Sequence, residues 1–450
     1  MIRGLRSTLM LLVLFITLGG YAYFIESERP PASENSSSEL AFELDPENIV
    51  ELQVTVKEGD VTRLERSPDD DGNSWSIRSP VEVDADDNSV SAIVNALESL
   101  EVTRVVEIEP SNLSTFGLAD PVIEVSFRTE NSSTASQLLI GDQTPTGSDL
   151  YAKTDDSTRV FLIANFHEST FNRTTFELRD KTVLDFDGPD VEGLLISSDD
   201  FVIRFSKNNN VWQITEPMNA RADFGLVEGL IGRLGSAEMQ SVELESNERS
   251  PESLELFGLA DANLTVSVET SNADDAVLEM GSETSDGAVF SRDASRDLVF
   301  TIDNSLATDL GRTVDVYRQK DLFSFRPFNA TQLNIEYGEA TKSFKKQEDE
   351  DGSVWKQVGR NAEEVDQTTI EELLTKLSAL RAQSFVDSQD GTGLDSPLAI
   401  VEIEFDDTKE RVVIGRSGEK TYGVNGDEHG AANLDSQAVD EILNSIDAQL

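Results

Sequence analysis

The sequence of 450 residues contains no cysteine and only two histidines, His167 and His429. Without cysteine the chain forms no disulfide and offers neither a thiol nucleophile nor a cysteine-ligated zinc site. The histidines lie in different parts of the sequence, and neither has a second histidine near it, which argues against a histidine-ligated zinc site. With 86 acidic residues present, no pair of carboxylates can be singled out for acid–base chemistry. The sequence therefore predicts no metal site, no cofactor and no catalytic residue.

Basic residues are also scarce, with 36 lysines and arginines against 86 acids and a formal net charge of −50. Such a chain repels phosphate groups, which excludes nucleic acid as a partner of the folded part. The acids are spread along the whole sequence, which is typical of solvated surfaces rather than of an acidic tail. Two origins fit this acidity: a saline habitat, where salt screens the repulsion, and the ordinary acidity of an exported protein.

One uncharged run, residues 7–25, follows Arg3 and Arg6 and precedes Glu26 and Glu28. A helix of this length spans roughly 28 Å, about the thickness of the hydrocarbon core of a bilayer. The arginines before it orient the bulk of the chain away from the cytoplasm. We therefore predict a cytoplasmic stub at 1–6, a transmembrane signal anchor at 7–25 and a flexible linker at 26–42. The predicted location is the inner membrane, crossed once, with the C-terminal bulk in the periplasm or outside the cell.

A cleaved signal peptide is the alternative interpretation of the same run. Small residues at Gly20 and Ala22 could mark a cleavage site, but the apolar run continues through residues 23–25. Because the apolar core of a signal peptide ends near its cleavage site, we favour the uncleaved anchor. Both interpretations export the protein.

The chain has only three tryptophans, and each is followed 11 residues later by an aspartate. These pairs are Trp75 with Asp86, Trp212 with Asp223, and Trp355 with Asp366. Apolar residues follow each aspartate at offsets 4, 7, 8 and 11, a spacing that places them on one stripe of a helix. Each aspartate stands where an N-cap residue belongs. The sequence thus predicts three copies of one unit, each with a tryptophan packed on its own capped helix.

Two further features recur in the copies. A turn with Gly117, Gly258 or Gly393 precedes alternating apolar residues, a pattern that predicts a tight turn leading into a half-buried strand. The first two copies also share a closing tail with a basic pair and two apolar residues: Arg179 and Lys181 with Leu184 and Phe186, and Arg318 and Lys320 with Phe323 and Phe325. We interpret the basic pairs as interface residues near a domain junction, with an interdomain salt bridge to neighbouring acids as the simpler alternative.

These patterns predict an α+β fold of three tandem β-rich repeats. Each repeat is expected to contain a tryptophan-bearing hairpin strand, one amphipathic helix and further antiparallel strands. The tryptophans are 137 and 143 residues apart, so each unit is large enough to bury a core of its own. The predicted repeat domains are 43–186, 187–326 and 327–450.

Three local motifs suggest ligand sites, but their context argues against each. The acidic runs at 69–74 and 348–353 lack the bidentate glutamate of an EF-hand and precede a repeat tryptophan, which favours hairpin turns. The stretch 415–421 lacks the adjacent Gly-Lys pair of a phosphate-binding loop, and no helix is expected after it. The Ser-x-x-Lys spacing at Ser417 and Lys420 has no partner residues.

Several of the recurring motifs resemble one bacterial family, the domain of unknown function catalogued as 4340. They are the Trp-x-Ile-x-x-Pro strands at 75–80 and 212–217, the Phe-Gly-Leu-Ala-Asp-Pro turn at 116–121, and Leu-Arg-Asp-Lys at 178–181. The resemblance extends from about residue 43 onward and is weakest in the third copy, where Val358, Gly359 and Arg360 replace the Ile and Pro positions. It implies an N-terminal membrane helix with an extracytoplasmic repeat region. It also implies an accessory role beside gliding-motility-like ABC transporters, and it implies no catalytic residues.

The sequence therefore favours a membrane-anchored extracytoplasmic scaffold or binding protein that works with an envelope protein, such as subunits of an ABC-type transporter, and that is not an enzyme. Two alternatives remain open: an envelope hydrolase that uses carboxylates, and a receptor for a small ligand at a domain junction. An enzyme should break the threefold similarity with a pocket of convergent polar groups in one repeat.

Overall fold

The computed structural model describes residues 39–447, except 58, 68–73, 246–249, 273, 297, 350–351 and 360–364. The predicted stub, the predicted anchor at 7–25 and most of the predicted linker lie outside the described residues. In the part that is described, no helix has the length and apolar character needed to cross a membrane. The chain forms three antiparallel sheets of eight or nine strands with accompanying helices, which confirms the predicted α+β class.

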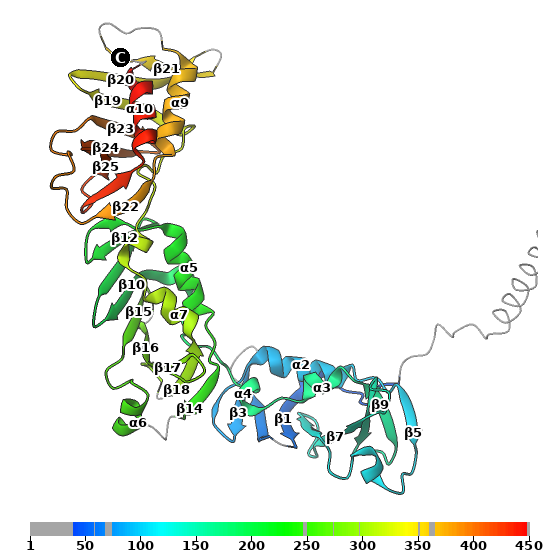
Figure 1. Cartoon of the computed structure of the whole chain (residues 1–450). Coiled ribbons are helices and arrows are strands. Elements are labelled where there is room, and N and C mark those ends of the chain that lie inside the picture. The colour runs from blue at the N-terminus through cyan, green and yellow to red at the C-terminus, as the bar shows by residue number, and fades with distance from the viewer. Residues whose placement is uncertain are drawn as a thin grey trace, which may run out of the picture. The chain divides into compact units, whose positions relative to one another are not determined.

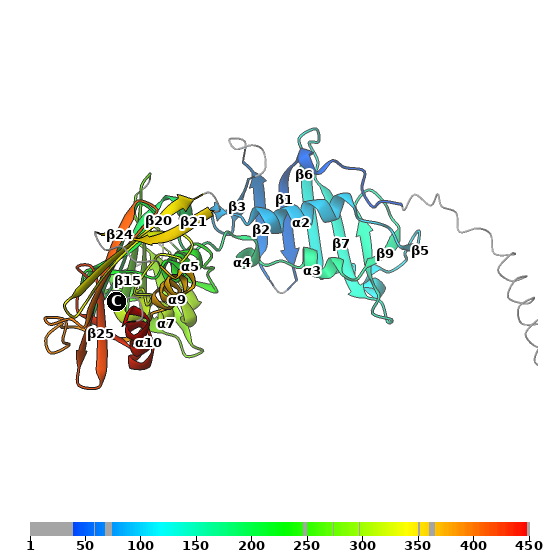
Figure 2. The ribbon, with the colours of Figure 1, turned by 90° about the horizontal axis from the view of Figure 1, so that it is seen from above.

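The first sheet has nine strands in the order β4-β3-β2-β1-β6-β7-β8-β9-β5. Its strands are β1 (Ile49–Val56), β2 (Val61–Arg66), β3 (Trp75–Ser79), β4 (Val83–Asp84), β5 (Arg104–Glu107), β6 (Ile123–Thr129), β7 (Ser136–Gln143), β8 (Asp149–Thr154) and β9 (Val160–Ala164). Its helices are α2 (Asp87–Glu98), α3 (His167–Phe171) and α4 (Thr175–Leu178), with 3-10 turns η1 (Pro46–Asn48) and η2 (Leu113–Phe116). Figure 2 shows α2 lying across one face of this sheet with α3 beside it.

The second sheet has the order β13-β12-β11-β10-β15-β16-β17-β18-β14. Its strands are β10 (Val191–Ser198), β11 (Val202–Asn208), β12 (Val211–Glu216), β13 (Ala220–Arg221), β14 (Ser241–Leu244), β15 (Leu264–Thr270), β16 (Ala276–Glu283), β17 (Ala288–Asp293) and β18 (Val299–Asp303). Its helices are α5 (Phe224–Gly235), α6 (Pro251–Leu256), α7 (Asn304–Leu310) and α8 (Val314–Tyr317), with the 3-10 turn η3 (Gly188–Asp190).

The third sheet has the order β21-β20-β19-β23-β24-β25-β26-β22. Its strands are β19 (Ala330–Tyr337), β20 (Ala340–Asp349), β21 (Gly352–Gln357), β22 (Ala382–Val386), β23 (Ala399–Phe405), β24 (Thr408–Ser417), β25 (Lys420–Asn425) and β26 (Ala431–Leu434). Helices α9 (Gln367–Ser378) and α10 (Ser436–Asp447) lie side by side (Figure 1). Taken strand by strand, the three orders correspond, and among the described residues only the short edge strand β4 or β13 has no counterpart in the third sheet.

Each tryptophan lies on the strand that precedes the helix and is almost fully buried. Trp75, Trp212 and Trp355 are 3%, 1% and 2% exposed. Trp75 shares a core with the buried stripe of α2, and Trp355 shares one with the stripe of α9. An indole buries a large apolar area, so it ties the hairpin to the helix.

Each of the three helices begins with an aspartate N-cap. Asp86 accepts hydrogen bonds from the amides of Asn88 and Ser89, and Asp223 and Asp366 cap α5 and α9 in the same way. Capping satisfies amides that the first turn leaves without an intrahelical partner.

The recurring turn glycines are required by close packing of the backbone. Gly117, Gly258 and Gly393 all have positive φ, between 69° and 82°. A Cβ atom at Gly117 would lie 2.6 Å from the amide nitrogen of Asp142, and one at Gly258 would lie 2.9 Å from that of Ser282. Only glycine adopts this conformation and tolerates this approach without strain.

The repeats begin earlier than the predicted boundaries after residues 186 and 326. Each sheet is entered by a segment that pairs with the chain just after the helix of that sheet. The hydrogen bonds run from Ala41 N to Leu100 O (2.7 Å), from Val183 N to Ala237 O (3.1 Å) and from Leu322 N to Leu380 O (3.0 Å). Phe323 and Phe325 are accordingly buried in the core of the third sheet. The apolar tails that seemed to close the first two copies therefore pack into the copies that follow them.

The chain divides into two compact units, Met1–Asp180 and Lys181–Leu450. The first contains the first sheet, and the second contains the second and third sheets together. The division at residue 180 agrees with the entry segment at 181–183.

Candidate functional site

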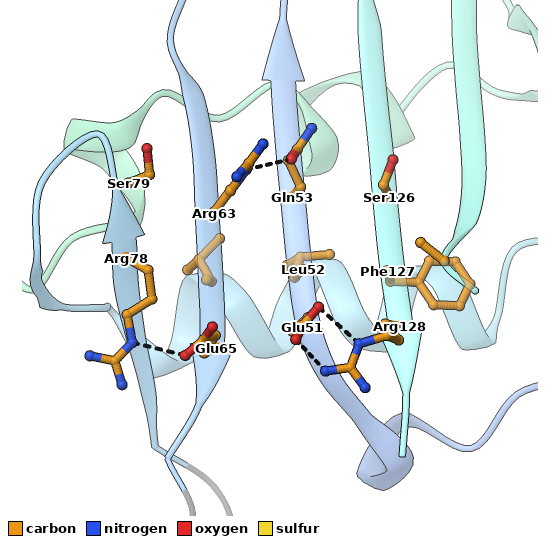
Figure 3. A pocket seen from close by; sticks show the side chains of 12 residues that line it. Glu51, Leu52, Gln53, Arg63, Glu65, Arg78, Ser79, Ser126, Phe127 and Arg128 are labelled. Carbon is orange, nitrogen blue, oxygen red and sulfur yellow. Dashed lines mark hydrogen bonds and ion pairs between the residues drawn. The ribbon is translucent and has the colours of Figure 1, made fainter. Parts of the chain in front are cut away.

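One face of the first sheet carries two rows of polar side chains that cross strands β3, β2, β1 and β6 (Figure 3). On these strands the alternate residues, such as Leu52, Leu64 and Ile77, are buried in the core beneath α2. Because successive side chains of a strand point to opposite sides, the polar residues between them lie on the face away from α2. The rows surround a hollow of about 380 Å³.

The first row, which we name the Arg63 row, consists of Ser79, Arg63, Gln53 and Ser126. Strand register places Arg63 opposite both Ser79 and Gln53, and places Gln53 opposite Ser126. The Arg63 Nε donates a hydrogen bond of 2.9 Å to Gln53 Oε1. Arg63 is exposed, and no ion pair with a carboxylate is found for it among the described residues. It is the one charged member of its row.

The second row, the ion-pair row, consists of Arg78, Glu65, Glu51 and Arg128. Arg78 Nε lies 3.1 Å from Glu65 Oε2, and Arg78 also pairs with Glu82 at 2.9 Å. Arg128 Nε donates a hydrogen bond of 2.9 Å to Glu51 Oε2, and its Nη2 contacts the other carboxylate oxygen. This hydrogen bond from Arg128 lowers the pKa of the Glu51 carboxyl below its ordinary value. The charges of this row therefore satisfy one another.

The chemistry of this hollow suits recognition. Its lining offers guanidinium, amide and hydroxyl donors, and its carboxylates are held by arginines. Among the described residues that line it there is no histidine, and no hydrogen bond joins the hydroxyl of Ser79 or Ser126 to a base of the kind that activates a serine nucleophile. An open, donor-rich sheet face of this kind can bind a partner that presents acceptor groups.

The sequence motifs did not select this face. Arg63, Arg78 and Arg128 lie at outward positions of strands in which buried and exposed residues alternate. Arginines at such positions in a strongly acidic chain could have indicated a binding face. Their grouping depends on strand register across residues 53 to 128, which no local motif reveals. Of the predicted anchors, Trp75 lies instead in the core on the α2 side of the sheet, and Asp86 caps α2.

The predicted interface residues Arg179, Lys181, Arg318 and Lys320 lie in the segments that lead into the second and third sheets. Arg318 is only 2% exposed, and its guanidinium lies 3.8 Å from the centroid of the Phe385 ring on β22. Its Nη2 donates a hydrogen bond of 3.0 Å to the backbone oxygen of His429. Desolvation lowers the pKa of Arg318 from its ordinary value. Arg318 thus joins the second repeat to the third.

The other three residues make backbone contacts in the same connecting segments. Arg179 is 4% exposed and bridges Ala85 through its backbone, as Arg318 bridges Ala222. The two lysines act through their backbone oxygens. Lys181 O accepts a hydrogen bond of 2.8 Å from Met239 N, and Lys320 O accepts one of 2.7 Å from Ala382 N.

Arg221, Glu410 and Glu428 complete the junction inside the second unit, and sequence reasoning missed all three. The Arg221 guanidinium donates to the backbone oxygens of Asp321 (2.9 Å) and Leu322 (3.2 Å). It also forms ion pairs with Glu428 and, at 3.6 Å, with Glu410. Arg221 comes from the second sheet and both glutamates come from the third, so this network holds the two sheets together.

The two histidines lie apart, and neither belongs to a metal cluster. His167 is 6% exposed and lies between the rings of Phe166 and Phe171. Burial lowers the pKa of His167 below its ordinary value. His429 donates its backbone N–H to Asn219 O (2.9 Å) at the junction. Among the described residues, no group of three His, Asp or Glu side chains could hold a metal ion.

Comparison with known families gives one match. The model of a family described as domain of unknown function (DUF4340) matches residues 75–211 and 212–397, more than half of the chain. The two matched stretches begin at Trp75 and Trp212, which are equivalent positions in the first two repeats. Comparison with curated proteins found no match.

Proposed function

Because the chain belongs to the family described as domain of unknown function (DUF4340), we propose its function from its architecture. It is a membrane-anchored, extracytoplasmic scaffold that binds a protein partner of the bacterial envelope and performs no chemistry of its own. The proposal extends to an architecture of three tandem repeats behind one N-terminal transmembrane helix.

The hollow on the first sheet is the observation that carries the proposal. It lies on an open sheet face, and its charges other than Arg63 form cross-strand ion pairs instead of converging on one reacting point. Broad, hydrogen-bonding surfaces of this kind suit protein contact, because paired charges give specificity and register at an interface.

The junction of the second and third repeats supports a scaffold role. Buried Arg318 and the pairs of Arg221 with Glu410 and Glu428 fix two repeats as one body. Two repeats that are held as one body need no ordering relative to each other when a partner contacts both, which lowers the entropy cost of binding.

The anchor rests on residues 7–25, whose 19 uncharged positions between arginines and acids match a single-pass helix with its C-terminal side outside. Among envelope partners, the subunits of an ABC-type transporter are the first to test, because the family resemblance implies an accessory role beside such transporters.

Site-specific photocrosslinking in cells tests this function. A photoreactive amino acid is placed at Ser126 on the hollow of the first sheet, or at Ser267, the register-equivalent position of the second sheet, as a matched control. The expected result is an adduct with an envelope protein from position 126 that is absent from position 267, recovered from the membrane fraction. Recovery of the bait alone from both positions would refute the binding role. Transporter subunits in the adduct would support the accessory role.

A further inference from the structure

Strand register makes Arg63 of the first sheet equivalent to Arg204 of the second. Arg63 lies opposite Gln53 on β1 and Ser79 on β3, while Arg204 lies opposite Leu195 on β10 and Glu216 on β12. The same arginine therefore occurs at the same place on two sheets, and its neighbours can be compared directly.

In the second sheet this arginine is held by two carboxylates of its own chain. Arg204 Nη1 lies 2.6 Å from Glu269 Oε1, and its Nε lies 3.8 Å from Glu216 Oε1. Gly193 stands opposite Glu269, and a Cβ atom at Gly193 would collide with the Glu269 carboxylate. The glycine therefore leaves the space through which Glu269 reaches Arg204.

In the first sheet all three of these neighbours have changed. Ser79 stands in the place of Glu216, Arg128 in the place of Glu269, and Glu51 in the place of Gly193. Glu51 and Arg128 pair with each other and fill the space, so neither serves Arg63. Glu65 faces the same hollow but is held by Arg78. Among the described residues Arg63 therefore pairs with no carboxylate, and its guanidinium donates instead to the neutral amide of Gln53.

We propose that the Arg63 row takes a carboxylate from outside the chain, supplied by an acidic, extended segment of a partner protein. The second sheet identifies the chemical group, because the equivalent arginine there holds carboxylates. Arginine binds a carboxylate through two parallel hydrogen bonds, and such charge-assisted bonds are among the stronger ones in proteins. In the same row Ser79 lies next to Arg63, and Ser126 lies beyond Gln53 (Figure 3). Their hydroxyls donate to further acceptors of the bound segment.

The inference rests on the proposed binding function and specifies the chemistry of the partner. The hollow of about 380 Å³ spans four strands, which is room for several side chains of an extended segment. The net charge of −50 opposes the approach of an acidic partner at long range. Physiological salt screens this repulsion beyond roughly 8 Å, whereas a direct contact with Arg63 is screened less.

A defined peptide tests the proposal on the full-length protein in detergent. The probe is a fluorescein-labelled hexapeptide of alternating serine and glutamate, and the control replaces each glutamate with glutamine. Fluorescence anisotropy at physiological salt should show saturable binding of the glutamate peptide alone. Arg63→Gln should weaken that binding at least tenfold, while the matched variant Arg204→Gln should leave it unchanged.

A second variant restores the internal carboxylate without removing the arginine. Ser79→Glu gives the first sheet the glutamate that Arg204 already has, so the new side chain should occupy Arg63 and weaken peptide binding by a similar factor. Equal binding of both peptides would overturn the proposal, as would equal loss in the Arg63 and Arg204 variants. A dimer that dissociates in the Arg63→Gln variant would also overturn it, because the occupant would then be a second copy of the chain.

The two proposals fail in different ways. If position 126 crosslinks to an envelope protein but the acidic peptide does not bind, the scaffold function stands and the acidic segment is rejected. If position 126 gives no adduct, the binding function itself fails, whatever the peptide does.

Discussion

Replacing Arg221 with alanine should loosen the junction between the second and third repeats. The side chain of Arg221 is 18% exposed, and those of Glu410 and Glu428 are 10% and 16% exposed. The variant leaves both glutamates largely buried without this partner, and it removes the hydrogen bonds to Asp321 O and Leu322 O. Breaking a buried ion pair typically costs 3–5 kcal/mol, and the residual solvent contact here favours the lower end, about 3 kcal/mol.

Hydrogen exchange of the full chain measures this loss, amide by amide. In the natural protein, the most protected amides of both sheets should open together, because the junction couples them. In the Arg221→Ala variant, the two sheets should open separately. Junction amides such as those of β25 should exchange roughly 100-fold faster, since about 1.4 kcal/mol corresponds to a factor of ten.

Arg204→Ala is the matched control, because Arg204 also pairs with two glutamates but its side chain is 35% exposed. Exposed pairs contribute about 1 kcal/mol or less, so this variant should change exchange little. Adding Glu428→Gln to Arg221→Ala should recover part of the loss by removing a stranded carboxylate. A loss of stability in the Arg221 variant no larger than in the Arg204 variant would refute a coupling role for Arg221, as would two sheets that still open together.

Two further predictions concern stability. Gly229 and Gly232 on α5 have no heavy atom within 4 Å of an added Cβ, so changing either to alanine should stabilise the protein by about 1 kcal/mol. Gly258 has a φ of +71°, so alanine there should destabilise the protein. A thermal shift in the opposite direction at any of these positions would contradict these conformational roles. His167 has a lowered pKa, so its contribution to stability should be complete above the unfolded pKa of about 6.5 and decrease as pH falls below it, because only the unfolded chain then takes up the proton. Urea midpoints measured at several pH values should fall less steeply with decreasing pH in the His167→Gln variant than in the natural protein. An identical pH dependence in the two proteins would exclude His167 as its source.

Local patterns in the sequence were enough to predict the parts of the fold that depend on nearby residues. The spacing from Trp75 to Asp86 and on to the apolar stripe predicts a capped helix, because helical periodicity and capping act within a few turns. The recurring glycines likewise mark turns. The family resemblance, based on such motifs, is shown by the match to residues 75–211 and 212–397.

The repeat boundaries needed the tertiary structure. Phe323 and Phe325 follow the second copy closely in sequence, so the pattern assigned them to its tail, yet they pack in the core of the third sheet. Hydrophobicity shows that a residue is buried, but it does not show which core buries it.

The candidate site was decided by pairing between distant strands. Arg63 and Arg204 look alike in the sequence, and each lies on the second strand of its sheet. Their environments differ because register sets Arg63 beside Gln53 and Ser79 and sets Arg204 within reach of Glu216 and Glu269. The sequence by itself determined the local elements and their repetition, since these depend on neighbours along the chain. The charge that remains available for a partner depends on cross-strand neighbours as many as 77 residues apart in the sequence, such as Glu51 and Arg128, and only the folded sheet brings these together.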